Sequence, residues 1–224
     1  MDDAAFKKVN IIGAGSHALV IADILRDMSG YSPASFIEKD ELIKDNRKNV
    51  APGLILPIYA QTDFFRDYSP ENAVEYLILG LGSGLISIRE KLIARLKDSC
   101  FVVAIHSSAV IAPSAQIGVG SVVMAGAVLN PYVKIGRHAI INTGATVDHE
   151  CEIGENTFIQ PGAHLAGNVK VGNNSIIGIG ANIKEGITVG SNSIVGGGAF
   201  VNNDVPDNVV YVGVPAKKLR DNIK

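Results

Sequence analysis

An aliphatic residue recurs at every sixth position from Ile105 to Val201, and this period limits the possible folds more than any other feature of the chain. All 17 positions in the series are Ile, Val or Leu. A small side chain usually stands two residues earlier, as Ala145 does before Val147. A pair of Ile or Val followed by glycine also recurs every 18 residues, beginning at residue 117. An ordinary sandwich of alternating strands would not keep a strict period of six, so we exclude that fold.

The two periods predict a parallel β-helix whose coils each contain three short strands. The aliphatic side chains are expected to point inward and stack from coil to coil, with the small residues inside the corners. Glycine is expected to supply the backbone angles of the turns. The repeat covers roughly five and a half coils, which exceeds the three that such a fold needs to support itself.

The N-terminal part of the chain lacks this period and alternates between expected strands and helices. Strands are expected at 8–15, 34–40 and 75–84, and helices at 17–28 and 87–98. This alternation predicts a small Rossmann-like α/β domain with a parallel sheet. We expect residues 41–62, which contain Pro52 and Pro57, to form a loop-rich connection.

The change of period places a domain boundary near residues 101–106. We therefore predict three parts of the chain. They are an α/β domain at 1–104, a β-helix at 105–204, and a C-terminal cap or tail at 205–224.

Composition excludes several classes of function. A net charge of −2 argues against a protein that binds nucleic acid by neutralising phosphates. No apolar run is long enough to span a membrane, and the N-terminus lacks the apolar core of a signal peptide, so we expect a cytoplasmic protein without membrane insertion. Cys100 and Cys151 are too few for a disulfide framework and too isolated for a thiolate metal site, so we expect two reduced thiols.

Between the first expected strand and helix, Gly13 to Ala18 match the pattern G-x-G-x-x-A. Glycines allow a phosphate close to the backbone, and the N–H groups at the start of the helix face the anion. Glu38 ends the next expected strand, as the acid of a dinucleotide site does. Because the domain has room for only about half of a doubly wound sheet, we favour a nucleoside diphosphate over NAD. NAD, and a turn that binds nothing, remain alternatives.

The run Asp148-His149-Glu150 is the strongest candidate for chemistry within the repeat. His149 comes two residues after the inward Val147, which puts its side chain on the outer face of a coil. A carboxylate beside a histidine can hold one ring nitrogen and raise the basicity of the other, as a general base requires. An inert surface histidine is the alternative. The three side chains are consecutive and diverge, so no metal site is expected.

The other four histidines have different expected positions. His17 belongs to the glycine turn, and His106 and His138 are expected on the surface. His164 precedes an inward aliphatic residue; its role is open, and it is the next candidate for the base.

The hexapeptide repeats and the C-terminal segment VVYVGVPAKKL (209–219) resemble the left-handed β-helix acyltransferases. Four further segments are similar to a narrower group, the NeuD/PglD-type bacterial sugar acetyltransferases. They are GAGSHA (13–18), NTGATVDHE (142–150), PGAHLAGNVKVG (161–172) and GGGAFV (196–201). Enzymes of this type use acetyl-CoA to modify nucleotide-linked amino sugars or sialic acid. The resemblance covers nearly the whole chain.

The resemblance implies roles for the residues of these motifs. His149 would be the general base, Glu150 would orient its ring, and Asn142 would lie near the reacting sugar. The nucleotide would contact Gly13, Gly15, Ser16, His17, Glu38, Lys39 and Gly80, with Gly82 as the alternative to Gly80. Glu38 and Lys39 stand where the family often has two aspartates that contact the base and ribose. This difference weakens the implied specificity for uridine.

The resemblance also implies acetyl-CoA as co-substrate, bound along the coils between neighbouring subunits of a homotrimer. The coenzyme is expected to contact Gly167, Ile179 and Gly197. Phe158 stands where some members place a histidine on the coenzyme, so this contact is expected to be lost or replaced.

The implied function is N-acetylation of a nucleotide-linked 4-amino-deoxysugar, with UDP as the expected nucleotide, in glycan biosynthesis. Transfer would be direct, with His149 as base and no acyl-enzyme. One alternative is O-acetylation of sialic acid or a related sugar. Another, of a different class, is a non-catalytic nucleotide-binding scaffold that the β-helix makes trimeric.

Overall fold

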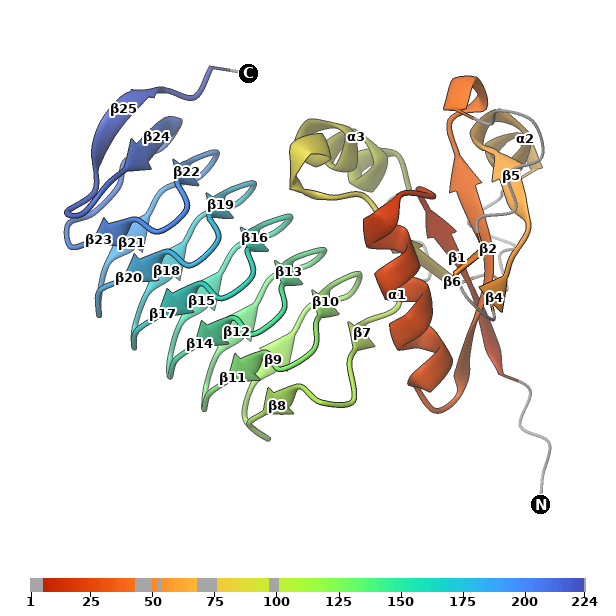
Figure 1. The fold of residues 1–224 in the computed structure, drawn as a ribbon, viewed down its shortest axis with the longest axis horizontal. Coiled ribbons are helices and arrows are strands. Elements are labelled where there is room, and N and C mark those ends of the chain that lie inside the picture. Colours follow the sequence, from red (N-terminus) through yellow and green to blue (C-terminus); the bar gives the residue numbers. More distant parts are fainter. Residues whose placement is uncertain (1–5, 43–49, 52–53, 68–75, 97–100, 224) are drawn as a thin grey trace. The chain divides into compact units, whose positions relative to one another are not determined.

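The computed structural model describes residues 6–42, 50–51, 54–67, 76–96 and 101–223. The chain divides into two compact units, Met1–Ala104 and Ile105–Lys224 (Figure 1). Cys100, which we expected to be a reduced thiol, lies outside the described residues.

The first unit contains a four-stranded parallel sheet with the order β5-β2-β1-β6. Its strands are β1 (Lys7–Ile12), β2 (Tyr31–Glu38), β5 (Ile58–Ala60) and β6 (Tyr76–Leu79). The helices are α1 (Ser16–Asp27), α2 (Gln61–Asp67) and α3 (Ile86–Leu96), with short 3-10 turns η1 (Asp40–Leu42) and η2 (Ser83–Leu85). A separate antiparallel pair consists of β3 (Val50–Ala51) and β4 (Leu54–Ile55). The predicted parallel α/β domain is therefore confirmed.

The expectation of a loop-rich connection at 41–62 is wrong. Within it, β5 pairs in parallel with β2 and adds a strand to the sheet. The Oδ1 of Asp40 accepts a hydrogen bond of 3.1 Å from the backbone N of Thr62, in the first turn of α2. A strand of three residues is too short to show a period of two, which is why the sequence pattern did not reveal it. Residues 43–49 and 52–53 lie outside the described part of this connection.

The second unit contains three sheets that run along a β-helix (Figure 1). The eight-stranded sheet contains β7 (Ala104–Ile105), β10 (Val122–Val123), β13 (Ile140–Ile141), β16 (Phe158–Ile159), β19 (Ile176–Ile177), β22 (Ile194–Val195), β24 (Val209–Val212) and β25 (Lys217–Asp221). The six-stranded sheet contains β8 (Val110–Ile111), β11 (Val128–Leu129), β14 (Thr146–Val147), β17 (His164–Leu165), β20 (Asn182–Ile183) and β23 (Phe200–Val201). The five-stranded sheet contains β9 (Gln116–Ile117), β12 (Lys134–Ile135), β15 (Glu152–Ile153), β18 (Lys170–Val171) and β21 (Thr188–Val189).

Pairing between coils keeps a register of 18 residues and stacks the aliphatic series inside the β-helix. Val147 of β14 pairs with Leu129 of β11 on one side and with Leu165 of β17 on the other. These three side chains are at most 2% exposed, and the small corner residues Ala145 and Cys151 are fully buried. The predicted inward positions and corner positions are confirmed. The C-terminal segment continues the same unit, because β24 pairs with β22 and β25 pairs with β24.

The glycines that recur every 18 residues serve a different purpose from the one we expected. Gly136 and Gly154 do not have positive φ angles. A Cβ on Gly154 would lie 2.6 Å from the backbone N of Asn173 in the next coil, so glycine here permits close approach of backbones. The left-handed turn residue comes two positions later, as at Asn156 with φ of 52°. Asparagine or glycine occupies most of these left-handed positions, because both tolerate such angles well.

His138, which we expected on the surface, is fully buried. It occupies a left-handed corner position with φ of 56°. Its ring fills the space above Gly120, where an added Cβ would overlap the imidazole. The next residue in the same corner column, Asn156, is also buried and donates a hydrogen bond of 2.8 Å to Asn174. Side chains of this column therefore stack along the inside of the corner. His106 is half-buried.

Replacement of Gly154 by alanine should destabilise the β-helix. The added Cβ would meet backbone atoms of Asn173 and Gly172 at 2.6 and 2.7 Å, and coil-to-coil hydrogen bonds from Gly172 N and to Asn173 O hold this backbone in place. We expect a loss of about 1–3 kcal/mol, since overpacking of this kind typically has that effect. Thermal unfolding followed by circular dichroism measures it. The matched control is Gly84→Ala, where no heavy atom lies within 4 Å of the added Cβ. Equal midpoints for the two variants would contradict the close-approach explanation.

Candidate active site

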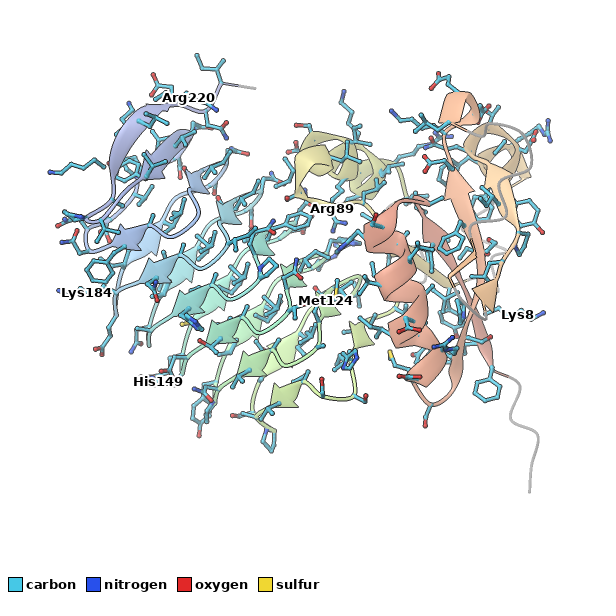
Figure 2. The ribbon with its side chains drawn as sticks, in the orientation of Figure 1. Lys8, Arg89, Met124, His149, Lys184 and Arg220 are labelled. Carbon is cyan, nitrogen blue, oxygen red and sulfur yellow. The ribbon has the colours of Figure 1, made fainter. Side chains whose placement is uncertain are left out.

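Two of the predicted catalytic residues flank the strand β14, at the corners before and after it. Asn142 lies in the corner that precedes β14, and its Oδ1 accepts a hydrogen bond of 2.8 Å from the backbone N of Thr143. His149 lies in the corner that follows β14, on the outside of the β-helix (Figure 2). The outer face of the six-stranded sheet lies between these corners.

The backbone around His149 is held in place by polar contacts. The Oδ1 of Asp148 accepts hydrogen bonds of 2.7 Å from the backbone N of His149 and from the side-chain amide of Asn130. The bond from Asn130, followed by the one from the His149 backbone, keeps the pKa of the Asp148 carboxyl below its usual value. The backbone O of His149 accepts a bond of 2.9 Å from the N of Asn168 in the next coil. Asp148 therefore acts on the position of the histidine through the backbone.

The side chain of His149 is 48% exposed and has a carboxylate partner. Its Nδ1 lies 3.3 Å from Oε2 of Glu150. Gly167, one coil further along, lies beneath the imidazole ring. The structure thus brings His149, Glu150 and Gly167 together. A half-exposed imidazole with a carboxylate on one ring nitrogen has the arrangement that a general base requires.

The sequence did not single out Thr146, although it pairs with His164 across adjacent coils. The Oγ1 of Thr146 lies 2.9 Å from the Nδ1 of His164. Both side chains stand on the outer face of the six-stranded sheet, next to Asn182 in the following coil. The signal for this contact was present, since the two residues are 18 positions apart at outward positions of the repeat.

The residues predicted to contact the coenzyme occupy three different places on the β-helix. Gly167 lies at the corner after the six-stranded sheet, whereas Ile179 and Gly197 lie in adjacent coils at the corner before it. Ile179 is 65% exposed, and a Cβ on Gly197 would come within 3.2 Å of its carbonyl oxygen. Phe158 stands on β16 of the eight-stranded sheet, paired with Ile140 and Ile176, and is 1% exposed.

In the first unit, the carboxyl ends of β1, β2 and β6 meet at the predicted nucleotide turn. Gly13 has φ of 107° and donates a hydrogen bond of 2.6 Å to the carbonyl of Ile37. A Cβ on Gly80 would lie 2.7 Å from the Cβ of Ala18, so packing against α1 requires a glycine there. Gly82 has no heavy atom within 4 Å of an added Cβ, so only Gly80 of the two alternatives is needed for close approach.

The carboxylate of Glu38 holds this turn to the end of β2. Its Oε2 accepts a hydrogen bond of 3.0 Å from the backbone N of Ala14, and its Oε1 accepts one of 2.8 Å from the N of Lys39. The first turn of α1 begins after Gly15, and no side chain caps it. Uncapped N–H groups at the start of a helix suit an anion. Gly15 and Ser16 are exposed at this point.

His17 lies beside a buried cation that the sequence analysis missed. Burial, together with the positive charge of Arg89, lowers the pKa of His17 to about 4, so the ring is neutral at neutral pH. Arg89 is fully buried, and its Nη1 donates to the carbonyls of Leu81 at 3.0 Å and Leu79 at 3.3 Å. Its position could have been found from the sequence. Residue 89 falls on the same helical face as the buried Leu92, Ile93 and Leu96 of α3.

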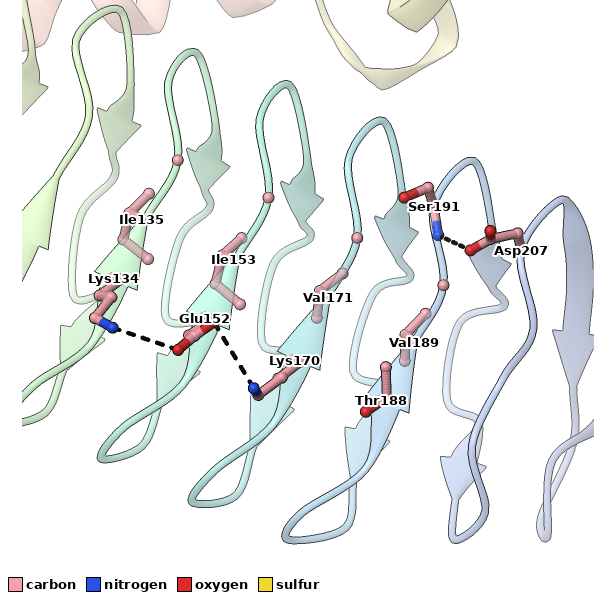
Figure 3. A pocket seen from close by; sticks show the side chains of 14 residues that line it. Lys134, Ile135, Glu152, Ile153, Lys170, Val171, Thr188, Val189, Ser191 and Asp207 are labelled. Carbon is pink, nitrogen blue, oxygen red and sulfur yellow. Dashed lines mark hydrogen bonds and ion pairs between the residues drawn. The ribbon is translucent and has the colours of Figure 1, made fainter.

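A groove of about 500 Å³ on the outer face of the five-stranded sheet contains none of the predicted site residues (Figure 3). It is lined in part by Lys134, Glu152 and Lys170. Glu152 lies 3.4 Å from Lys134 and 3.9 Å from Lys170, and all three side chains are about half exposed. Exposed ion pairs of this kind contribute little to stability. We assign no chemistry to this groove.

Within the described ranges, no three His, Cys, Asp or Glu side chains gather in a way that could hold a metal ion. Among the helices that the structure describes, none is long and apolar enough to cross a membrane.

Comparison with known families gives two matches, one in each unit. Residues 8–96 match the PglD N-terminal domain. Residues 150–178 match the bacterial transferase hexapeptide repeat. A search of curated proteins by sequence gave no match.

Solved structures resemble the whole chain. The acetyltransferase domain of PglB from Neisseria gonorrhoeae, in complex with acetyl coenzyme A, is 34% identical, with a TM-score of 0.82 over 96% of this chain and 100% of the other. PerB from Caulobacter crescentus, in complex with CoA and GDP-perosamine, is 36% identical, with a TM-score of 0.82 over 96% of this chain and 98% of the other. The chain belongs to the PglD-type sugar acetyltransferases. WeeI from Acinetobacter baumannii is more distant, at 26% identity and a TM-score of 0.78 over 95% of this chain and 100% of the other.

Membership of the PglD-type family confirms three predictions made from the sequence. They are the family itself, the left-handed β-helix after an α/β domain, and the acetyltransferase activity. The PglB and PerB structures also contain acetyl-CoA or CoA, the co-substrate expected from the resemblance.

The lowered pKa of His17 should make the acetyltransferase less stable as the pH falls. Between about pH 4 and 6.5 the unfolded chain binds more protons at this histidine than the folded chain does, so the free energy of unfolding rises with pH in that window. We expect the free energy of unfolding of the His17→Gln variant to rise less steeply with pH in this window, because the variant lacks this titrating group. Urea unfolding of both proteins at pH 4.5 and 6.5 measures the difference, which is at most about 1.4 kcal/mol per pH unit for one group. An equal pH slope in the two proteins would refute the assignment of a neutral, partly buried His17.

Proposed function

We propose that this PglD-type enzyme transfers the acetyl group of acetyl-CoA to the amino group of a nucleotide-linked 4-amino-deoxysugar. The observation that carries the proposal is the half-exposed His149, whose Nδ1 lies 3.3 Å from the carboxylate of Glu150 at a corner of the β-helix. PerB, at 36% identity, is named as a perosamine N-acetyltransferase and contains GDP-perosamine. This relative favours an amine over a hydroxyl as acceptor. We also propose a cytoplasmic homotrimer.

The first unit would hold the nucleotide diphosphate. The uncapped start of α1 at Gly15, Ser16 and His17 offers N–H groups and the positive end of the helix dipole. His17 is neutral, so it would contribute a hydrogen bond, and the nearby Arg89 would contribute positive charge. Glu38 already uses both oxygens to hold the turn, so it would act on the nucleotide chiefly by shaping this turn.

The second unit would provide the base. A bond from Nδ1–H of His149 to Glu150 leaves Nε2 with a lone pair, and Nε2 would accept a proton from the sugar amine. Acetyl-CoA supplies the activated thioester carbonyl. As the new N–C bond forms, the C–S bond breaks, and the sulfur leaves with its electron pair and takes up a proton as the thiol. Asn142, at the other end of β14, would contact the sugar.

Direct transfer is supported by the state of the buried cysteine. Cys151 follows Glu150 in sequence, but its side chain points into the corner and donates to the carbonyl of Ala166. Burial raises the pKa of this thiol to about 11, so it is a poor nucleophile at neutral pH. No acyl-enzyme on Cys151 is needed.

A homotrimer is supported by the spread of the predicted coenzyme contacts. Gly167 and the pair Ile179 and Gly197 lie at different corners of the β-helix. A coenzyme bound between two neighbouring subunits would meet one corner of each. The exposed Ile179 offers an apolar surface for such a contact.

The activity is tested by release of CoA thiol from acetyl-CoA with a panel of acceptors. We expect turnover with a nucleotide-linked 4-amino-deoxysugar, and UDP-, GDP- and dTDP-linked forms identify the nucleotide. Free sialic acid tests O-acetylation. Binding of acetyl-CoA without thiol release for every acceptor would refute the proposal and would favour the scaffold.

Replacement of His149 by alanine should lower kcat by about 10²–10⁴-fold, because general-base catalysis typically contributes that much. Acetyl-CoA binding, measured by calorimetry, should change by less than about twofold, since the proton transfer is not part of binding. Glu152→Gln, on the outer face of the five-stranded sheet, is the control and should retain activity. Full turnover in the His149→Ala variant would move the base elsewhere, with His164 as the next residue to replace.

A further inference from the structure

The imidazole of His149 occupies the space that a side chain at position 167 would fill. A Cβ built on Gly167 would lie 2.5 Å from Nε2 and 3.1 Å from Nδ1 of His149. The three heavy atoms nearest to this Cβ all belong to the ring. Ordinary contact distances are about 3.5–4.0 Å, so no side chain fits at position 167 while the ring stays in place.

The turn itself does not require glycine at this position. The left-handed residue of the corner is the next one, Asn168, with φ of 59°, and Gly167 has no positive φ. The equivalent position of other corners accepts bulky side chains. Examples are Pro131, Arg137, Thr143, Glu155, Ile179 and Glu185. The absence of a side chain at 167 is therefore explained by the histidine and not by the backbone.

The ring atoms nearest to the added Cβ are Cε1 and Nε2, so the edge of the ring that faces Gly167 includes the nitrogen that the chemistry needs. Nδ1 lies toward Glu150, at 3.3 Å from Oε2, and Nε2 lies toward Gly167. A methyl group at position 167 would press on Nε2, so it would either cover this nitrogen or force the ring to swing away from Glu150.

We propose that Gly167 is a positioning residue for the general base: its missing side chain lets the His149 ring pair with Glu150 while Nε2 stays open to the sugar amine. The proposal rests on the proposed function for its catalytic consequence. It adds to the predicted contact of the Gly167 backbone with acetyl-CoA and is separable from that contact by experiment.

The kinetic test is a double-mutant cycle of Gly167→Ala and His149→Ala with the nucleotide-sugar acceptor. We expect Gly167→Ala alone to lower kcat by about 10²-fold, because a displacement of about 1 Å at a reacting group has an effect of this size. In the His149→Ala background the same change should have almost no further effect, since the ring on which it acts is gone. A full loss in both backgrounds, together with weaker acetyl-CoA binding, would overturn the proposal and assign Gly167 to the coenzyme alone.

A spectroscopic test does not depend on the acceptor or on turnover. The ring ¹⁵N and ¹H signals of His149, assigned by comparison with His149→Ala, should shift in Gly167→Ala. The matched control is Gly197→Ala, at the equivalent position of a different corner, where the added Cβ meets only the backbone of Ile179. It should leave the His149 signals unchanged. Unchanged signals in Gly167→Ala would overturn the proposal even if the enzyme is active. A shift in a protein without transferase activity would support the positioning role and refute only the proposed function.

Discussion

The structure depends on the 18-residue register that joins each coil of the β-helix to the next. Pairs such as Val147 with Leu165 fix this register, because a slip by one residue would turn every inward aliphatic side chain outward. The inward and small corner positions are thereby committed to the core. The outward positions, and the corner positions two residues after each inward residue, are free to carry other residues without loss of packing. His149 occupies one of these free positions, so the proposed general base is added to the β-helix without interrupting its packing.

The corner geometry itself presents the carboxylate to the histidine. Glu150 is the left-handed residue of its corner, with φ of 59°, where most other corners have glycine or asparagine. A bulkier residue in this conformation costs about 1 kcal/mol or more. The left-handed turn directly after His149 lets adjacent side chains approach, so that Nδ1 and Oε2 are 3.3 Å apart. A glutamate at a strained position that asparagine would fill more easily is consistent with a functional requirement.

Sequence patterns predicted what repeats and missed what occurs once. The period of six predicted the coils, the core positions and the outward His149, because each coil supplies an independent repetition of the same signal. The strand β5 has three residues and no repetition, so it was missed. The buried His138 was misplaced because its ring fills the space that Gly120 leaves open in the preceding coil, and a simple in–out alternation does not describe such a corner. The recurring glycines were correctly noticed but wrongly explained, since close backbone approach and positive φ both select glycine.

The two histidines with proposed roles, His17 and His149, show why an exposed base needs precise neighbours. His17 is partly buried, and this burial, together with the charge of Arg89, keeps it neutral, which suits a residue that only has to donate or accept a hydrogen bond. A base that takes a proton from a bound substrate must instead remain accessible, and His149 is 48% exposed. Accessibility removes the surrounding core that would fix the ring, so orientation has to come from a few contacts. Glu150 lies against Nδ1 of the ring, and Asp148 and Asn168 hold the backbone of His149 by hydrogen bonds. Gly167 leaves open the space that the ring occupies. The corners of the repeat otherwise accept many side chains, so the missing side chain at Gly167 is as informative as the proposed general base beside it.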